Sequence, residues 1–192
     1  AIIDLLAGHQ LKTGILTAFY QRDFGKQGGA MVSVSLYDSA IASLANQATN
    51  WLMESHIPER IGSKHPNIAP YGELFTTKDN LTLTFAIGSN QQFQKLCSIL
   101  GVTELSEHPN FVNNQARVNN RLSLTSYLRD AVGQFHSTDL IPILKQNFVP
   151  VARIKNLKEV FETEEAQALI LKETVNGMET ERVQTAVFNI TH

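Results

Sequence analysis

The spacing of apolar residues in the first third of the chain predicts a helix, a strand and a second helix. Residues 4–20 carry apolar side chains at helical spacing, and 31–36 alternate between apolar residues and serines. Residues 38–55 are rich in alanine and predict one long helix. This order of elements is expected at the end of an α/β sheet domain, and we assign 1–55 to such a segment.

The residues that follow are rich in proline and glycine, which interrupt helices and central strands. They include Pro58, Gly62, Pro66, Pro70 and Gly72. A loop of this length is uncommon unless it has a function of its own. We therefore predict that 56–72 is a linker that contains a domain boundary.

Shorter elements of both kinds come next, which predicts a separate α+β domain over 73–192. Strands are expected at 73–77, 81–87, 149–154, 169–175 and 181–187, and the first two form a hairpin. Helices are expected at 91–100, 119–135, 138–147 and 156–161. The helix at 91–100 is expected to bury Phe93, Leu96, Cys97 and Leu100, so Cys97 is expected to be a buried structural residue. Asn90 is the expected N-cap of the first of these helices and Gly101 its stop. The last two strands flank Asn176-Gly177, and their five-residue separation predicts more than a minimal turn.

The composition supports a folded core, because 43% of the 192 residues are hydrophobic and 18% are charged. Sixteen basic against 18 acidic residues argue against a nucleic-acid partner, since phosphate binding uses clustered positive charge. No apolar run approaches the roughly 18 residues of a membrane span, so no membrane partner is expected. Cys97 is the only cysteine, which excludes an internal disulfide and favours a reducing compartment.

Familiar catalytic motifs are absent from the sequence, and the six histidines are not spaced as metal ligands. We therefore expect no metal and no bound cofactor. Two candidates for chemistry remain. Asp4, followed by Gly8 and Gly14, is either a helix N-cap or a nucleophile that the helix dipole keeps ionised. The segment 62–72 is either a plain linker or a loop that closes over a ligand.

Several segments together resemble one protein family. They are DLLAGHQLKTGILTAFYQRDFGKQGG, RIGSKHPNIAPYGELFTTKDN, ARVNNRLSL and NFVPVARIKNLKEVF, and they follow one another in the family's order. The sequence resembles the class III CoA-transferases, which include formyl-CoA transferase, carnitine CoA-transferase and α-methylacyl-CoA racemase. The resemblance extends over nearly the whole chain and is closest to the succinyl-CoA:glutarate CoA-transferase branch.

The resemblance implies that the chain corresponds to the second half of such an enzyme. It would contain the C-terminal end of a large Rossmann-like domain over 1–55, a linker with an active-site loop over 56–72, and a small α+β domain over 73–192. Family members are interlocked homodimers, and most of their CoA contacts lie in the half that this sequence lacks. The abrupt start in apolar residues leads us to expect a piece of a longer protein.

The family's nucleophile is an aspartate, and the resemblance aligns it with Asp4. His65, Asn67, Ile68 and Ala69 fall near a glycine-rich loop that shields the intermediates of formyl-CoA transferase. Here His-Pro-Asn-Ile-Ala replaces the glycine run, so Asn67 is the candidate for the shielding role. The resemblance implies a CoA thioester as substrate, and it assigns no CoA-binding residue in this chain.

Three hypotheses about function follow. The first is transfer of CoA between an acyl-CoA and a carboxylic acid through a covalent intermediate on Asp4. The second is a racemase of 2-methylacyl-CoA thioesters on the same scaffold, and the third is a folded piece with no activity of its own. The apolar faces of 4–20 and 31–36 have few local partners, so we expect them to be exposed or covered by another chain. The expected location is the cytoplasm, or the mitochondrial matrix in a eukaryote.

Overall fold

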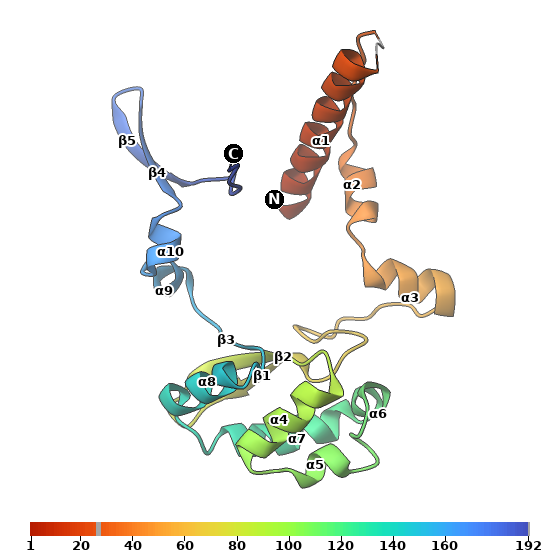
Figure 1. The fold of residues 1–192 in the computed structure, drawn as a ribbon, viewed down its shortest axis with the longest axis vertical. Coiled ribbons are helices and arrows are strands. Elements are labelled where there is room, and N and C mark those ends of the chain that lie inside the picture. Colours follow the sequence, from red (N-terminus) through yellow and green to blue (C-terminus); the bar gives the residue numbers. More distant parts are fainter. Residues whose placement is uncertain (26–27, 192) are drawn as a thin grey trace. The chain divides into compact units, whose positions relative to one another are not determined.

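The computed structural model describes residues 1–25 and 28–191 and contains both helices and strands (Figure 1). The chain divides into two units, 1–61 and 62–192. The point of division lies inside the segment rich in proline and glycine. None of the helices in the described ranges combines the length and the apolar composition that a bilayer crossing requires.

The first unit contains helices and, among its described residues, no strand. The helices are α1 (Ile2–Phe24), α2 (Leu36–Ala42) and α3 (Asn46–Glu54). The predicted strand over 31–36 is wrong, because 28–35 have no regular structure and Leu36 begins α2. An alternating segment becomes a strand only where a neighbour completes its hydrogen bonds, and no described residue pairs with this one.

The single long helix predicted over 38–55 is also wrong, because the chain breaks between α2 and α3. Ala45 has φ 50° and ψ −127°, which is not a helical conformation. Two serines favour short helices here. The Ser35 hydroxyl caps α2 by accepting a hydrogen bond from the Asp38 amide, and the Ser43 hydroxyl donates to the Ala40 carbonyl at its end. The alanine content alone therefore overestimated the length of the helix.

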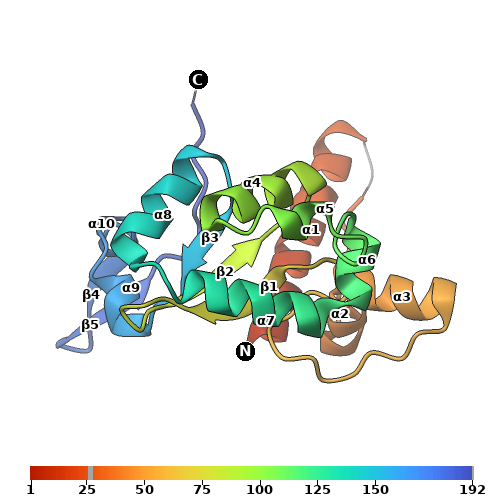
Figure 2. The same cartoon turned by 90° about the horizontal axis from the view of Figure 1, so that it is seen from below.

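The second unit is built on an antiparallel sheet in the order β1-β2-β3, with helices on one face (Figures 1 and 2). The strands are β1 (Tyr71–Thr76), β2 (Thr82–Ala86) and β3 (Val151–Arg153). The covering helices are α4 (Asn90–Leu100), α7 (Arg121–Val132) and α8 (Ser137–Gln146). The predicted hairpin over 73–87 is confirmed, and Asn80 in its turn has φ 60°.

The core of the second unit lies between this sheet and the covering helices. Phe75 pairs with Leu83 across β1 and β2, and Phe85 pairs with Val151 across β2 and β3, which places these four side chains on the helix-covered face. The inward positions of α4 are as predicted. The fully buried apolar side chains from the helices are Phe93, Leu96, Cys97, Leu124, Leu128, Val132, Leu140 and Leu144.

The ends of α4 follow a standard sequence signal, with one correction. Ser89, and not Asn90, is the N-cap, and it forms a capping box with Gln92. Gly101 ends the helix with φ 73°, as predicted. Asn90 is thereby available for a contact elsewhere, which is described below.

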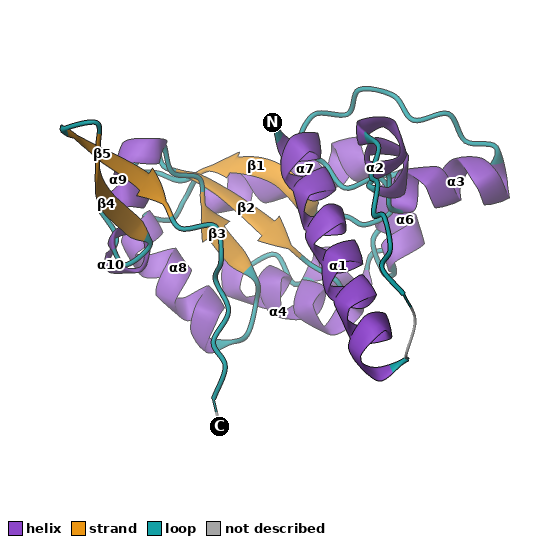
Figure 3. Cartoon of the chain, turned by 90° about the horizontal axis from the view of Figure 1, so that it is seen from above, coloured by secondary structure: helices purple, strands orange, loops and turns teal. Residues whose placement is uncertain are grey.

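The remaining elements are short. They are α5 (Glu104–Glu107), α6 (Asn114–Asn119), α9 (Leu157–Phe161), α10 (Glu164–Gln167), β4 (Ile170–Val175) and β5 (Met178–Val183). Strands β4 and β5 form a second sheet of two strands (Figure 3). The prediction of a long connection is wrong, because Asn176 and Gly177 alone form the turn with φ 52° and 79°. Positive φ at both positions is typical of the tight type I′ turn.

Candidate active site

Asp4 lies in the first turn of α1, with its side chain 68% exposed. The predicted N-cap role is wrong, because the cap is Ala1 and no side chain bonds to the helix end. The Asp4 Oδ2 atom is 3.4 Å from the α-amino nitrogen of Ala1. The helix dipole favours an anion in the first turn of a helix. Because most of the Asp4 side chain is exposed, its carboxylate is accessible to a ligand in this structure.

The two glycines that follow Asp4 have different structural settings. A Cβ added at Gly8, one turn after Asp4, would meet no atom within 4 Å. A Cβ at Gly14 would lie 2.6 Å from Val32 Cγ1, so this glycine permits close approach of the 28–35 segment to α1. Open space is thus found beside Gly8, one turn after Asp4, and packing explains Gly14.

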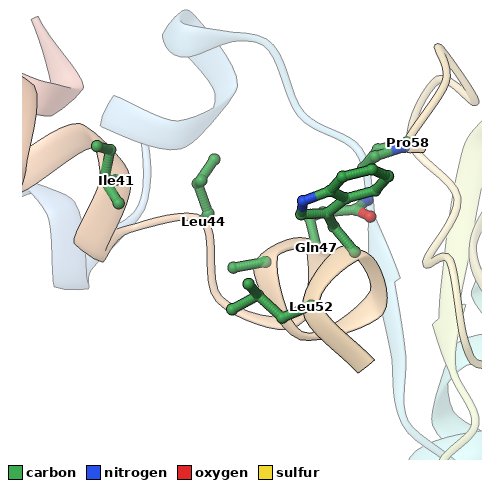
Figure 4. A pocket seen from close by; sticks show the side chains of 7 residues that line it. Ile41, Leu44, Gln47, Leu52 and Pro58 are labelled. Atoms are coloured by element: carbon green, nitrogen blue, oxygen red, sulfur yellow. The ribbon is translucent and has the colours of Figure 1, made fainter. Parts of the chain in front are cut away.

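The first unit also contains a cavity of about 500 Å³ around α3 (Figure 4). Its lining is apolar except for one amide, and consists of Ile41, Leu44, Gln47, Ala48, Trp51, Leu52 and Pro58. The Gln47 Oε1 atom is buried and has no hydrogen-bond partner among the described residues. Asp4 does not line this cavity, and no residue of the lining is a nucleophile or an ionisable group.

The predicted loop residues lie in the second unit, within a loop whose two ends are joined. The Ser63 hydroxyl donates to the Gly72 carbonyl at 2.6 Å, and the His65 amide donates to the Tyr71 carbonyl at 2.8 Å. Gly72 has φ 86°, and a Cβ there would lie 2.1 Å from the Ser63 carbonyl oxygen. Glycine is therefore required at the point where the loop closes.

The four predicted site residues of this loop differ in burial. Asn67 is exposed, His65 and Ile68 are half-buried, and Ala69 is fully buried. The Asn67 amide donates to His65 Nδ1 at 3.1 Å. Ala69 has no side-chain surface to offer a substrate in this conformation, whereas the other three reach the surface of the unit.

Side chains from α6 and α7 bond to the backbone of this loop. Asn114 accepts a hydrogen bond from the Ala69 amide at 3.2 Å and donates one to the Asn67 carbonyl at 2.8 Å. Arg117 donates to the Ala69 carbonyl at 2.7 Å. Arg121 donates to the carbonyls of His65 at 2.6 Å and Ile68 at 3.0 Å. The loop is therefore held by its backbone.

Arg121 and Glu73 form an ion pair that is almost removed from solvent. The exposed fractions of the two side chains are 13% and 2%. The second oxygen of Glu73 accepts a hydrogen bond from the Tyr71 amide at 2.6 Å. Because both oxygens of the carboxylate are used, the guanidinium has a fixed anchor on β1.

Arg117 is fully buried, and no carboxylate among the described residues lies within ion-pair distance of it. Its two terminal nitrogens donate to the Phe111 carbonyl and the Asn90 Oδ1 atom, both at 3.0 Å, and its Cζ atom lies 4.5 Å from the centre of the Phe93 ring. Burial lowers the pKa of Arg117. A buried cation needs such partners, because desolvation without them is costly.

The sequence analysis missed Asn114, Arg117, Arg121 and Glu73. Asn114, Arg117 and Arg121 have the spacing i, i+3, i+7, and two of them lie in a segment quoted for the family resemblance. The helical spacing of Asn114 and Arg117 within α6 was the available signal, whereas Arg121 lies on the next helix, α7. Polar residues at helical spacing are ordinarily taken for a solvent-exposed face, and only the tertiary contacts show otherwise.

Other titratable groups in the described part of the chain form no further site. No cluster of three or more His, Cys, Asp or Glu residues there is arranged to hold a metal ion. Burial in the core raises the pKa of Cys97 to about 12, so its thiol is protonated at neutral pH. The expectation of a structural cysteine on an apolar helix face is confirmed.

The fold has counterparts among solved structures. The structure of a CAIB/BAIF family protein from Brucella suis matches 98% of this chain and 48% of its own chain, with a TM-score of 0.68 and 31% identity. A Mycobacterium tuberculosis protein matches 98% of this chain with a TM-score of 0.79, and at 22% identity it supports the fold alone. The class defined by these similarities is a mixed α/β protein related to CAIB/BAIF proteins.

The family model of CoA-transferase family III matches residues 1–191, and the chain belongs to this family. The succinate–glutarate CoA-transferase of Agrobacterium fabrum is 32% identical over 88% of this chain. The acetyl-CoA:oxalate CoA-transferase of Acetobacter aceti is 30% identical over 83% of it. The chain spans 41% and 40% of the lengths of these two relatives, respectively.

Proposed function

We propose that this chain is the C-terminal part of a class III CoA-transferase that moves CoA from an acyl-CoA to a carboxylic acid. The observation that carries the proposal is the family match over 1–191, together with relatives that are named as CoA-transferases. Further support comes from Asp4, which the sequence resemblance aligns with the family nucleophile and whose carboxylate is exposed.

In the proposed reaction, the Asp4 carboxylate attacks the thioester carbonyl carbon of the acyl-CoA. The C–S bond breaks, CoA leaves as a thiolate, and a mixed anhydride forms on Asp4. The thiolate then attacks the Asp4 carbonyl carbon, which releases the donor acid and leaves an enzyme–CoA thioester. The acceptor carboxylate attacks this thioester and expels the CoA thiolate, which gives a second anhydride on Asp4. The thiolate then attacks the acceptor's carbonyl carbon, which forms the new acyl-CoA and releases the Asp4 carboxylate. A carboxylate suits this role because its anhydride is reactive enough to be reopened.

The loop residues His65, Asn67 and Ile68 are proposed to shield these intermediates from water. Anhydrides hydrolyse readily, so transfer requires a site that excludes solvent. The support is the position of the three residues at the surface of the second unit on a backbone that is held in place. Ala69 contributes to the same loop through its backbone, since its side chain is buried.

The architecture belongs to the proposal as well. We infer that 1–55 completes a Rossmann-like large domain, that 73–192 is the small domain, and that two full-length chains interlock as a homodimer. The support is the exposed apolar surface of the first unit, which includes Leu16, Phe19 and Trp51. Cys97, which is buried and unpaired, is compatible with the cytoplasm or the mitochondrial matrix.

A racemase on the same scaffold and an inactive piece are the alternatives. A racemase moves a proton at the α-carbon and needs no acyl-enzyme adduct. The 192-residue chain by itself is expected to be inactive, because most of the CoA pocket would come from the other half. Detection of a covalent intermediate therefore discriminates the transferase from both alternatives.

The test uses the full-length gene product with an acyl-CoA, followed by digestion and mass spectrometry. We expect an acyl or CoA adduct on the peptide that carries Asp4, and loss of both the adduct and the turnover in Asp4→Ala. Asp38→Ala is the matched control, since Asp38 is another exposed aspartate in a first helical turn of the same unit. Turnover retained by Asp4→Ala would remove Asp4 from the mechanism, and α-proton exchange without an adduct would favour the racemase.

A further inference from the structure

We propose that Asn114, Arg117 and Arg121 are positioning residues that hold the loop 65–69 in one conformation before a substrate arrives. We call these three side chains the loop clamp. The loop then acts as a preformed wall of the site and not as a mobile lid. The role of the loop as a wall of the catalytic site rests on the proposed function. The fixed conformation of the loop does not depend on that proposal.

The number of bonds to so short a segment carries the inference. The loop clamp bonds to five backbone groups within five residues, namely the carbonyls of His65, Asn67, Ile68 and Ala69 and the amide of Ala69. Their distances range from 2.6 Å to 3.2 Å, which is the normal range for such bonds. A lid that opens and closes would have to exchange most of these bonds with water in each cycle.

The clamp is itself anchored to the core of the second unit. Arg121 is paired with Glu73 on β1. Arg117 is held by Asn90 and by the ring of Phe93, both on α4. Two guanidinium groups therefore connect the loop to β1 and to α4, which belong to the ordered core of the second unit.

Arg117 makes opening of the loop especially unfavourable. It is fully buried without a carboxylate partner in the described part of the chain, so each of its acceptors matters. If the loop moved away, the Ala69 carbonyl would leave a buried positive charge with one acceptor fewer. A buried polar network is stable only when it is fully satisfied, and here the loop backbone is a part of that network.

The clamp also explains how this loop can lack the glycine run of formyl-CoA transferase. The loop clamp bonds to backbone atoms, so these hydrogen bonds do not depend on which side chains the loop carries. Pro66 restricts the loop further, because the proline ring fixes φ. Side chains at 65, 67 and 68 can therefore vary with the substrate while the conformation of the backbone is kept.

The first test uses the 192-residue chain and does not depend on activity. Hydrogen exchange is measured at the Ala69 amide in Asn114→Ala, which removes both bonds from Asn114. We expect the Ala69 amide to exchange about tenfold faster, because local opening of the loop no longer has to break the two bonds to Asn114. Asn113→Ala is the matched control, because Asn113 caps α6 through the Ala116 amide and makes no described bond to the loop. Equal exchange in the two variants would overturn the clamp.

The second test uses the full-length enzyme and measures how acyl-CoA divides between CoA transfer and hydrolysis. In Arg121→Lys and Asn114→Ala, we expect the ratio of hydrolysis to transfer to rise by roughly tenfold, because a loosened wall admits water to the anhydride. Arg153→Lys is the control, since Arg153 pairs with Glu159 in the same unit and away from the loop. A merely structural role would lower both rates together and leave the ratio unchanged.

The outcomes separate the two proposals. An unchanged ratio in an active Arg121→Lys enzyme would overturn the clamp as a catalytic device. An unsubstituted enzyme that transfers no CoA would overturn the proposed function, while exchange at Ala69 still decides whether the loop is held.

Discussion

The two units of this chain differ in how many of their residues are buried by their secondary structure. The first unit has three helices, yet Ser39 is the only buried residue among its described residues. Helix α1 spans 23 residues without burying any of them. The second unit has mostly shorter helices, but a continuous core of phenylalanine and leucine side chains lies between its sheet and its helices.

This difference teaches that local helix formation and tertiary stability are separate properties. Exposed apolar residues of the first unit include Leu5, Leu16, Phe19, Tyr20, Trp51, Leu52 and Met53. A patch of this kind on a soluble helix ordinarily marks a surface that another chain or segment covers. The expectation that α1 leaves its apolar face exposed in this chain is confirmed. The second unit needs no such partner for its main core.

The largest effect is expected when the two units are separated. Residues 62–191 expressed alone should unfold cooperatively on heating, because the main core lies within them. Residues 1–61 alone should show no cooperative transition by circular dichroism or calorimetry. A sharp transition for 1–61 would mean that its helices have a core of their own, and the contrast between the units would be lost.

A matched pair of leucine substitutions tests the same contrast at single residues. Leu128→Ala should lower the free energy of unfolding of the 192-residue chain by about 3 kcal/mol, since large-to-small changes in a core leave a cavity. Leu128 is 0% exposed and Leu16 is 60% exposed. Leu16→Ala should change stability by less than about 0.5 kcal/mol. Urea unfolding measures both, and comparable losses would contradict the assignment of the core.

Ion pairs provide a third comparison, within the second unit. Glu73→Gln should cost about 2 kcal/mol, because hydrogen bonds to charged groups contribute more than neutral ones. Glu173→Gln, on the exposed β4–β5 hairpin, should give no measurable change, since its partner Arg182 remains solvated. Chemical unfolding of both variants is the measurement. A larger effect for Glu173 would show that the hairpin, and not the loop clamp, limits stability.

The smallest effect is a pH dependence from Asp79, which links the β1–β2 turn to α8. The carboxylate accepts hydrogen bonds from the Ser137 hydroxyl at 2.6 Å and from the Ser137 amide at 2.9 Å. The Ser137 hydroxyl, followed by Thr77, holds the pKa of Asp79 well below its usual range. The stabilisation is therefore complete at neutral pH and is lost as the pH falls below about 4.

The corresponding variant is Asp79→Asn. The difference in thermal midpoint between the unsubstituted chain and this variant should be largest at neutral pH and should shrink on acidification. Ser137→Ala removes the donor side of the same contact and should reproduce the trend. A difference that grows as the pH falls would show that the sign of the Asp79 contribution is wrong.

Much of the second unit followed from local sequence signals. The β1–β2 hairpin, the inward face of α4 and the Gly101 stop were predicted because alternation, helical periodicity and a C-terminal glycine act over a few residues. Strands β4 and β5 were predicted, whereas their turn was not recognised as the minimal Asn176-Gly177 type. The predictions for the first unit failed at 31–36 and at Ala45, where the neighbours or the backbone conformation could not be inferred from spacing.

The candidate site divides in the same way. Asp4 and the segment 62–72 were singled out from local features, and the resemblance then suggested their roles, but nothing in the sequence showed that Ala69 would be buried. Asn114, Arg117 and Arg121 were not recognised, because the loop residues to which they bond lie 45 or more residues away in the chain. Glu73 was taken as an ordinary residue of a strand, although it anchors Arg121.

The sequence by itself determined the family, the helical character of 4–20 and the buried face of α4. These depend on short-range patterns and on motifs whose order can be recognised along the chain. Only the tertiary structure decided that 31–36 is not a strand and that the buried guanidinium of Arg117 bonds to the loop backbone. The physical reason is that strand pairing and the solvation of a buried charge are set by groups distant in sequence, which no local pattern specifies.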